Sequence, residues 1–195
     1  NKNFYYVWDP TRNVRGAYVT VDVINNINNF PSSSANKYAQ SGQAFFVQTL
    51  TNGASQMLFK ETDKVVNTSS STIFRNTLDV PELKLVLYES QAFLDGGSEV
   101  DALLVHFDAS FSSTVDEYDA EKPINQDENF GLRNNSKTLS IERRNLPIET
   151  DELPLHVDQY RNTNYTIVAT SSLDNALYTY LYDKHTQNYI IMENY

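Results

Sequence analysis

The last third of the chain, from Asn129 to Tyr195, consists of short segments in which apolar and polar residues alternate. A period of two is typical of half-buried antiparallel strands, and the Asn, Asp, Ser and Pro residues between the segments are typical of turns. We expect strands at residues 139–141, 153–157, 164–168, 176–182 and 188–191. Such a series favours a β-sandwich that binds or supports other molecules over an enzyme.

The first two thirds have the same character. Residues 16–24 alternate cleanly, with Ala17, Val19, Val21 and Val23 on one face. The turn signal Thr51-Asn-Gly53 predicts a hairpin that joins a strand at 43–50 to one at 56–60. We expect further strands at 4–8, 82–89 and 100–107, a turn at 90–97, and one short helix at 112–122.

Together these segments predict an all-β fold, an antiparallel β-sandwich of jelly-roll-like kind with at most one short helix. The 13 Tyr and 10 Phe residues support this prediction, because aromatic residues favour sheets. A seam near residues 76–81 divides an N-terminal β layer or subdomain, 1–80, from a C-terminal sandwich part, 81–195. One two-layered sandwich and two subdomains both fit. We also expect the sequence to be a fragment of a much longer chain, since it starts without Met inside a strand approach.

The charge excludes some partners. The formal net charge is −10 and the pI is about 4.7. An acidic surface repels phosphate backbones and anionic lipid, so we expect neither nucleic-acid binding nor direct membrane insertion. The chain has no Cys and therefore no disulfide framework. It also lacks the run of about 20 apolar residues that a membrane helix needs.

Catalytic signals are weak. The three histidines, His106, His156 and His185, are far apart, and none accompanies a strained nucleophile turn. His106 and His156 read as strand-face residues, and His185 lies in a polar turn. Zinc ligands are usually closely spaced, so a zinc site is not expected. We assign no catalytic, cofactor-binding or metal-binding residue and expect the chain not to be an enzyme.

Two groups of carboxylates raise the question of calcium, which prefers six to eight oxygen ligands. Asp116 and Asp119 could face one point on a helical turn, with Glu117 and Glu121 close by. The favoured interpretation is structural: Asp116 and Glu117 would stabilise a helix N-terminus, and Asp119 would pair with Lys122. Calcium is kept as the weaker alternative. The second group, around a Gly-Gly turn, is Asp95, Glu99 and Asp101.

Aromatic residues suggest a sugar-stacking surface as a further alternative. Tyr178, Tyr180 and Tyr182 share one face of an expected strand. Tyr5, Tyr6 and Trp8 are candidates near the N-terminus. We favour a core or cross-strand aromatic ladder for the first group, and a core position at a strand end for Trp8.

A set of ordered motifs resembles a known family. The motifs are Phe4-Tyr-Tyr-Val-Trp8-Asp9-Pro10, Gly42-Gln-Ala-Phe-Phe-Val47, Glu99-Val-Asp-Ala-Leu-Leu-Val-His-Phe107, Asp116-Glu-Tyr-Asp-Ala-Glu-Lys122, Leu139-Ser-Ile141 with Leu146-Pro147, and Tyr165-Thr-Ile167. In this order they resemble the β-rich region that precedes the C-terminal sorting domain in cell-surface and secreted proteins of Bacteroidetes. The chain departs from the family at Leu155-His156-Val157, where a Gly is often found.

The resemblance implies export by the type IX secretion system and display outside the outer membrane or release. It implies a non-catalytic β module in adhesin-like or gliding-motility proteins, with secretion machinery or surface-anchoring components as partners. We therefore expect a module that presents or spaces an adhesin-like passenger. The alternative is a carbohydrate-binding module or surface glycan-binding protein, which requires an exposed aromatic platform. A hydrolase fragment is a third option and requires a deep acidic cleft.

Overall fold

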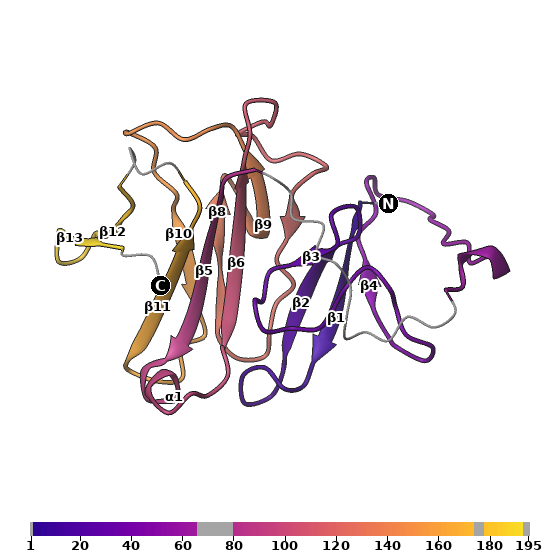
Figure 1. Ribbon diagram of the computed structural model, residues 1–195, viewed down its shortest axis with the longest axis horizontal. Coiled ribbons are helices and arrows are strands. Elements are labelled where there is room, and N and C mark those ends of the chain that lie inside the picture. Colours follow the sequence, from indigo (N-terminus) through magenta and orange to yellow (C-terminus); the bar gives the residue numbers. More distant parts are fainter. Residues whose placement is uncertain (1, 66–79, 174–177, 193–195) are drawn as a thin grey trace.

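The computed structural model describes residues 2–65, 80–173 and 178–192, and within them nearly all regular structure is β-strand (Figure 1). The strands form a four-stranded sheet, a seven-stranded sheet and a two-stranded hairpin. The helical elements of these residues are the α-helix α1 (Ser90–Leu94) and one 3-10 turn, η1 (Glu61–Asp63). The prediction of an all-β fold is confirmed.

The four-stranded sheet comes from the first quarter of the chain and has the order β3-β2-β1-β4. Its strands, each antiparallel to its neighbours, are β1 (Phe4–Asp9), β2 (Ala17–Asp22), β3 (Ile27–Asn28) and β4 (Phe46–Val47). The predicted apolar face of β2 is confirmed, because Ala17, Val19 and Val21 are fully buried.

The seven-stranded sheet has the order β10-β8-β9-β6-β5-β11, and β7 pairs with β9 beside this path. Its strands are β5 (Glu82–Glu89), β6 (Asp101–Phe107), β7 (Ala120–Glu121), β8 (Asn129–Asn134), β9 (Lys137–Arg144), β10 (Leu155–Asp158) and β11 (Tyr165–Ser171). The pair β6–β9 is parallel and the other pairs are antiparallel. Alternation does not reveal strand direction, because side chains alternate in both kinds of pairing.

The main core lies on one face of this larger sheet. Leu83, Leu85 and Leu87 share this face, as their spacing predicts, and they pack with the fully buried Phe130. Side chains of both edge strands, β10 and β11, contact the same core. The sheet therefore curls around its own apolar face.

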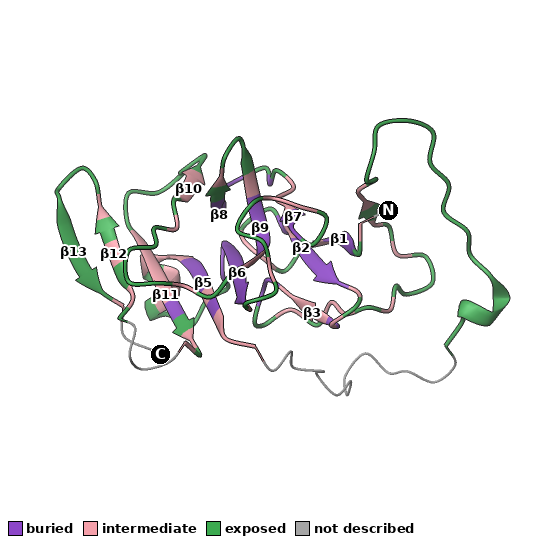
Figure 2. Cartoon of the chain, turned by 90° about the horizontal axis from the view of Figure 1, so that it is seen from above, coloured by how far each residue is buried: buried purple, intermediate pink, exposed green. Residues whose placement is uncertain are grey.

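The opposite face of the larger sheet packs against the small sheet. Val86 and Ala102 contact Val19 and Val21 in one cluster, and a second cluster joins Phe4 to strands β6, β7 and β9. Figure 2 shows the buried residues concentrated where the two sheets meet. This face-to-face packing is what makes the fold sandwich-like.

Two regions at the periphery are largely exposed (Figure 2). The first is the C-terminal hairpin of β12 (Tyr180–Asp183) and β13 (Asn188–Ile191). The second is the segment 48–65, where Leu58 and Phe59 are 74% and 71% exposed. Neither region belongs to the two larger sheets. Among the described residues, no helix is sufficiently long and apolar to cross a membrane.

The predicted hairpin between residues 43–50 and 56–60 is wrong. Residues 56–60 are not a strand, and β4 is confined to Phe46–Val47, where it pairs with β1. The apolar residues Met57, Leu58 and Phe59 are consecutive rather than alternating. They therefore offer no single face that could be buried against a sheet.

The helix prediction is also wrong in its position. Residues 112–122 form turns and the short strand β7, because the carboxylates of Asp116 and Asp119 accept backbone N–H groups of Tyr118 and Asp116. Such local bonds compete with a helix. The helix instead occupies the predicted turn at 90–97, where the side chain of the N-cap residue Glu89 accepts the N–H of Ala92 at 2.7 Å.

Two predictions fall partly outside the described residues. The seam at 76–81 includes residues 76–79, and the strand at 176–182 includes residues 176 and 177, none of which the structure describes. Within the described part, the strands of the small sheet all precede residue 48, and those of the larger sheet all follow residue 81.

Candidate functional site

Three ion pairs join the small sheet and its loops to the region of the larger sheet. In each pair the carboxylate side chain is at most 7% exposed. We call the six residues the intersheet network: Arg12 with Glu99, Arg15 with Asp127, and Asp22 with Arg143. Buried charges are tolerated only when they are paired and hydrogen-bonded, so this network fixes how the two sheets meet.

Both carboxylate oxygens of Glu99 are engaged. Its Oε2 lies 2.6 Å from Nη1 of Arg12, and its Oε1 accepts the hydroxyl of Ser32 at 2.6 Å. The backbone carbonyl of Glu99 accepts the N–H of Asn13 at 3.0 Å. Glu99 therefore ties the β1–β2 connection and residue 32 to the start of the β6 region.

Glu128 links the larger sheet's curl to the N-terminal layer. Its carboxylate accepts the hydroxyl of Tyr165 at 2.6 Å, the guanidinium of Arg161 at 2.9 Å and the side-chain amide of Asn13 at 3.0 Å. Burial raises the pKa of Glu128, but these hydrogen bonds outweigh burial and lower the pKa to about 2. Glu128 is thus held as a structural carboxylate rather than as a proton donor.

The candidate carboxylates around the Gly-Gly turn are dispersed. Glu99 belongs to the intersheet network, and Asp101 contacts Lys122. Asp95 is exposed and accepts the side-chain amide of Gln91 at 3.0 Å. The Gly-Gly turn therefore does not gather these three side chains around one point.

The candidate carboxylates between residues 116 and 121 are engaged in structural bonds. Asp119 is buried and accepts the backbone N–H groups of Asp116 and Arg143, each at 2.8 Å. Burial raises the pKa of Asp119, against the lowering effect of these bonds. Glu121 pairs with Lys137 at 2.8 Å. The expected pairing of Asp119 with Lys122 is wrong, because Asp119 bonds to the backbone while Lys122 lies against Asp101.

No group of three or more His, Asp or Glu side chains able to hold a metal ion occurs among the described residues.

The histidines do not form a site with one another. His106 lies on β6, is 1% exposed, and neither ring nitrogen has a hydrogen-bond partner among the described residues. His156 is on the edge strand β10, and His185 is in the exposed turn between β12 and β13. Burial lowers the pKa of His106 to about 4, so its ring is neutral near neutral pH.

The N-terminal aromatic candidates are not an open platform. Tyr5 and Tyr6 are buried, and Trp8 packs edge-to-face on Tyr18 with 4.9 Å between ring centroids. The indole of Trp8 also fills the space over Gly16, where an added Cβ would lie 2.5 Å from the ring. These rings are part of the packing of the small sheet.

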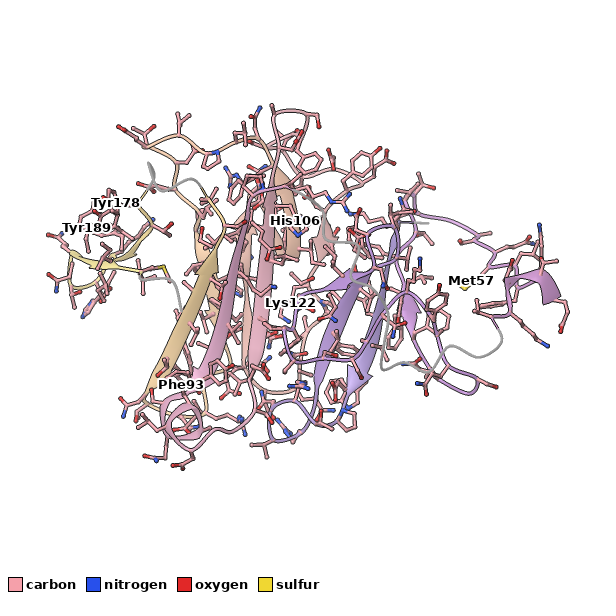
Figure 3. The ribbon with its side chains drawn as sticks, in the orientation of Figure 1. Met57, Phe93, His106, Lys122, Tyr178 and Tyr189 are labelled. Atoms are coloured by element: carbon pink, nitrogen blue, oxygen red, sulfur yellow. The ribbon has the colours of Figure 1, made fainter. Side chains whose placement is uncertain are left out.

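The C-terminal tyrosines do lie at the surface. Tyr178, Tyr180 and Tyr182 are 72%, 50% and 38% exposed, and Tyr189 on β13 is 70% exposed. Tyr182 and Tyr189 stack with 4.5 Å between centroids, while Tyr180 meets Tyr189 edge-on. Figure 3 shows Tyr178 and Tyr189 at the hairpin, at the end of the molecule away from the small sheet. The hypothesis of a buried tyrosine face is wrong, and the cross-strand ladder is present.

A shallow groove of about 400 Å³ runs along the edge of the small sheet at β4. Its lining includes the apolar side chains of Tyr18, Phe46 and Ile124 and the polar side chains of Gln48 and Glu121. The side-chain amide of Gln48 donates to Oε1 of Glu121 at 3.0 Å. Because Glu121 is already paired with Lys137, the groove offers aromatic edges and one amide rather than a reactive carboxylate pair.

The sequence did not single out most of the residues that this geometry joins. No sequence motif includes Arg12, Arg15, Arg161, Asp127 or Glu128. One available signal was Asp127-Glu128 placed immediately before the buried residues of β8, since charges entering a core require partners.

The described side chains thus form structural pairs, an exposed tyrosine ladder and a shallow groove. Comparisons of the chain with protein-family models, with curated proteins and with solved structures found no match.

Proposed function

We propose that this chain is a non-catalytic β module of a cell-surface or secreted protein, in which it presents or spaces an adhesin-like passenger. The single observation that carries the proposal is the intersheet network. Each of its three carboxylates forms an ion pair that joins one sheet region to the other; they belong to Asp22, Glu99 and Asp127. A spacer must hold a fixed geometry, and buried ion pairs favour one arrangement of two layers over others.

The ordered motifs from Phe4-Tyr-Tyr-Val-Trp8 to Tyr165-Thr-Ile167 support the cellular setting of the proposal. They resemble the region that precedes the sorting domain of type IX secretion cargo, which implies an extracellular position and contact with secretion or anchoring components. The net charge of −10 suits a domain that must stay soluble outside the cell.

The test is the mass and full sequence of the native polypeptide, together with its position in the cell. We expect a much longer chain that ends in a sorting domain and is accessible to added protease on intact cells. A mature protein of about this length, or one that protease reaches only after lysis, contradicts the proposal.

A second candidate function is glycan binding, and the observation that favours it is the exposed tyrosine ladder. Sugars stack on exposed aromatic faces, and Tyr178 and Tyr189 are each at least 70% exposed. The stacking of Tyr182 on Tyr189 turns two ring faces toward each other, so the outer faces and Tyr178 would carry the contact.

Glycan-array binding of the folded chain separates the two candidates. If the ladder binds sugar, Tyr189→Ala abolishes array signals that Tyr118→Ala preserves, because Tyr118 is also exposed but lies away from the hairpin, near Arg143. An empty array, or equal loss in both variants, eliminates the ladder as a sugar site.

A further inference from the structure

Lys122 and Asp101 form an ion pair that is almost completely withdrawn from solvent. Nζ of Lys122 lies 2.8 Å from each carboxylate oxygen of Asp101, and the two side chains are 2% and 0% exposed. Figure 3 places Lys122 between the two sheets. With both contacts this short, Nζ is about 3 Å from the carboxyl carbon, which is the separation from which bound reactants attack.

The backbone on both sides of this pair is fixed. Lys122 donates its N–H to the carbonyl of Thr138 at 2.8 Å, and Asp101 lies in the β5–β6 ladder opposite Leu87. The stem of Lys122 packs beside Gly131, where an added Cβ would lie 3.4 Å from Cδ of Lys122, an ordinary packing distance. Held in this way, the amine and the carboxyl carbon have little freedom to separate, and proximity of this kind lowers a reaction barrier.

The surroundings also provide donors for a developing negative charge. Oδ2 of Asp101 accepts the N–H of Phe130 at 2.8 Å and the side-chain amide of Asn125 at 3.2 Å. Asn125 is held in place by the N–H of Tyr18, which donates to its Oδ1 at 2.9 Å. Fixed donors aimed at one oxygen of a carboxyl group are the arrangement that stabilises a tetrahedral oxyanion.

Proton transfer within the pair is the remaining requirement, since an ammonium group is not a nucleophile and a carboxylate resists attack. Burial raises the pKa of Asp101, against the lowering effects of Lys122 and of the backbone donors. A more basic carboxylate takes a proton from the ammonium more readily and yields a neutral amine beside a neutral acid.

We propose that Lys122 and Asp101 condense inside the folded chain into an amide cross-link between their side chains. A proton first passes from Nζ to Oδ1. The lone pair of Nζ then attacks Cγ, and the π electrons move onto Oδ2, where Phe130 and Asn125 donate to it. When the intermediate collapses, the Cγ–Oδ1 bond breaks, and Oδ1 leaves as water with its own proton and a second one from Nζ. The products are one secondary amide and one water, and no oxidant or cofactor takes part.

The chain contains its own comparison. Lys137 and Glu121 approach to the same 2.8 Å, but their side chains are 48% and 29% exposed. Water solvates both charges there, so we expect that pair to remain an ion pair. Burial, rather than distance, is what separates the two pairs.

The test is the intact mass of the purified and then denatured chain. We expect a mass about 18 Da below that of the sequence, the mass of one water lost in the condensation. Lys122→Met removes the deficit, whereas Lys137→Met, the matched control, keeps it. Trypsin localises the bond, since Lys122 is the only Lys or Arg between residues 85 and 133 other than Arg133 itself, and Pro123 blocks cleavage after it. The deficit should therefore lie in peptide 85–133.

A wild-type chain of full mass overturns the proposal. A deficit that persists in Lys122→Met also overturns it, because a cyclic imide at Asp95-Gly96 would lose the same mass without using the lysine. If Lys122→Met does not fold, fragmentation of the wild-type peptide decides. A bond between residues 101 and 122 closes a ring, so a single backbone cleavage between these residues releases no fragment ion. A complete series of fragment ions from this stretch contradicts the cross-link. The cross-link does not rest on the proposed function, and neither result of this test changes the passenger proposal.

Discussion

Two regions of the molecule differ in what they bury. The interface between the two sheets buries charged groups, whereas the C-terminal hairpin exposes apolar ones. At the interface, Asp22 and Asp127 are fully buried, with charged partners. On the hairpin, Tyr189 and Ile190 are 70% and 55% exposed. Burial of the interface charges costs desolvation free energy, which their pairing offsets. The hairpin instead leaves apolar surface exposed to water.

The difference indicates a division of roles. A buried ion pair adds little net stability over an apolar contact, but it penalises every arrangement that leaves one charge alone. An exposed aromatic surface adds little to the fold and remains free to meet another molecule. The interface therefore fixes how the two sheets pack, and the hairpin leaves its aromatic side chains exposed. Each of the following changes tests one side of this contrast.

The largest effect is expected for Arg143→Ala. The substitution leaves the carboxylate of Asp22, 1% exposed, without its charged partner, so the free energy of unfolding should fall by about 3–5 kcal/mol. Urea unfolding followed by fluorescence measures the change. The control is Lys64→Ala, which breaks an exposed pair with Glu61 and should leave the midpoint unchanged. Equal effects in the two variants would refute the assigned role of the interface.

An intermediate effect is expected from pH through His106. Burial lowers the pKa of His106 from 6.5 to about 4, so the fold favours the neutral ring. The unfolded chain binds the proton below pH 6.5 and the folded chain only near pH 4. Stability is therefore complete above pH 6.5 and declines as the pH falls toward 4, by about 3 kcal/mol in total.

The measurement is the difference in unfolding free energy between the wild type and His106→Gln at several pH values. Taking the difference removes the pH dependence that comes from the carboxylates present in both chains. Glu128 titrates in a lower window, because its pKa is lowered to about 2. If the wild type loses no more stability than His106→Gln between pH 6.5 and 4, the folded chain does not disfavour the charged ring, and the prediction is wrong.

The smallest effect is expected for Tyr189→Ala. The substitution removes the stacked partner of Tyr182, and a cross-strand aromatic pair contributes about 0.2–1 kcal/mol. A two-stranded hairpin is marginal by itself, so amide exchange in residues 180–191 should accelerate while the global midpoint hardly moves. Hydrogen exchange with mass detection measures the local opening of residues 180–191, and urea unfolding measures the global midpoint. A large drop in the midpoint would mean that the hairpin belongs to the core.

The sequence predicted the parts of the fold that depend on side-chain periodicity. The face of Ala17, Val19 and Val21 and the face of Leu83, Leu85 and Leu87 are both buried as expected. It did not predict the parallel β6–β9 pair, because alternation carries no information on strand direction. It also misplaced the helix, since a single cap at Glu89 decides where so short a helix forms.

The sites were less predictable for a physical reason. Ion pairs such as Arg15 with Asp127 join residues 112 positions apart, and no local pattern encodes such a partner. Asp101 and Lys122 were both noticed, the first as a calcium candidate and the second as a partner for Asp119. Their mutual contact follows from the β6 and β7 geometry, which only the folded chain supplies.

The packing of the first strand has a consequence for how the chain reaches its fold. Phe4 is buried against Leu104, Ala120 and Ile141, and the amine of Lys2 donates to the carbonyl of Asp119, 117 residues away. Strand β1 therefore cannot complete its packing until the residues up to Ile141 have been synthesised. High contact order of this kind slows folding to milliseconds or longer. During that interval the aromatic residues of β1 are uncovered, and exposed apolar surface of this kind is what chaperones bind.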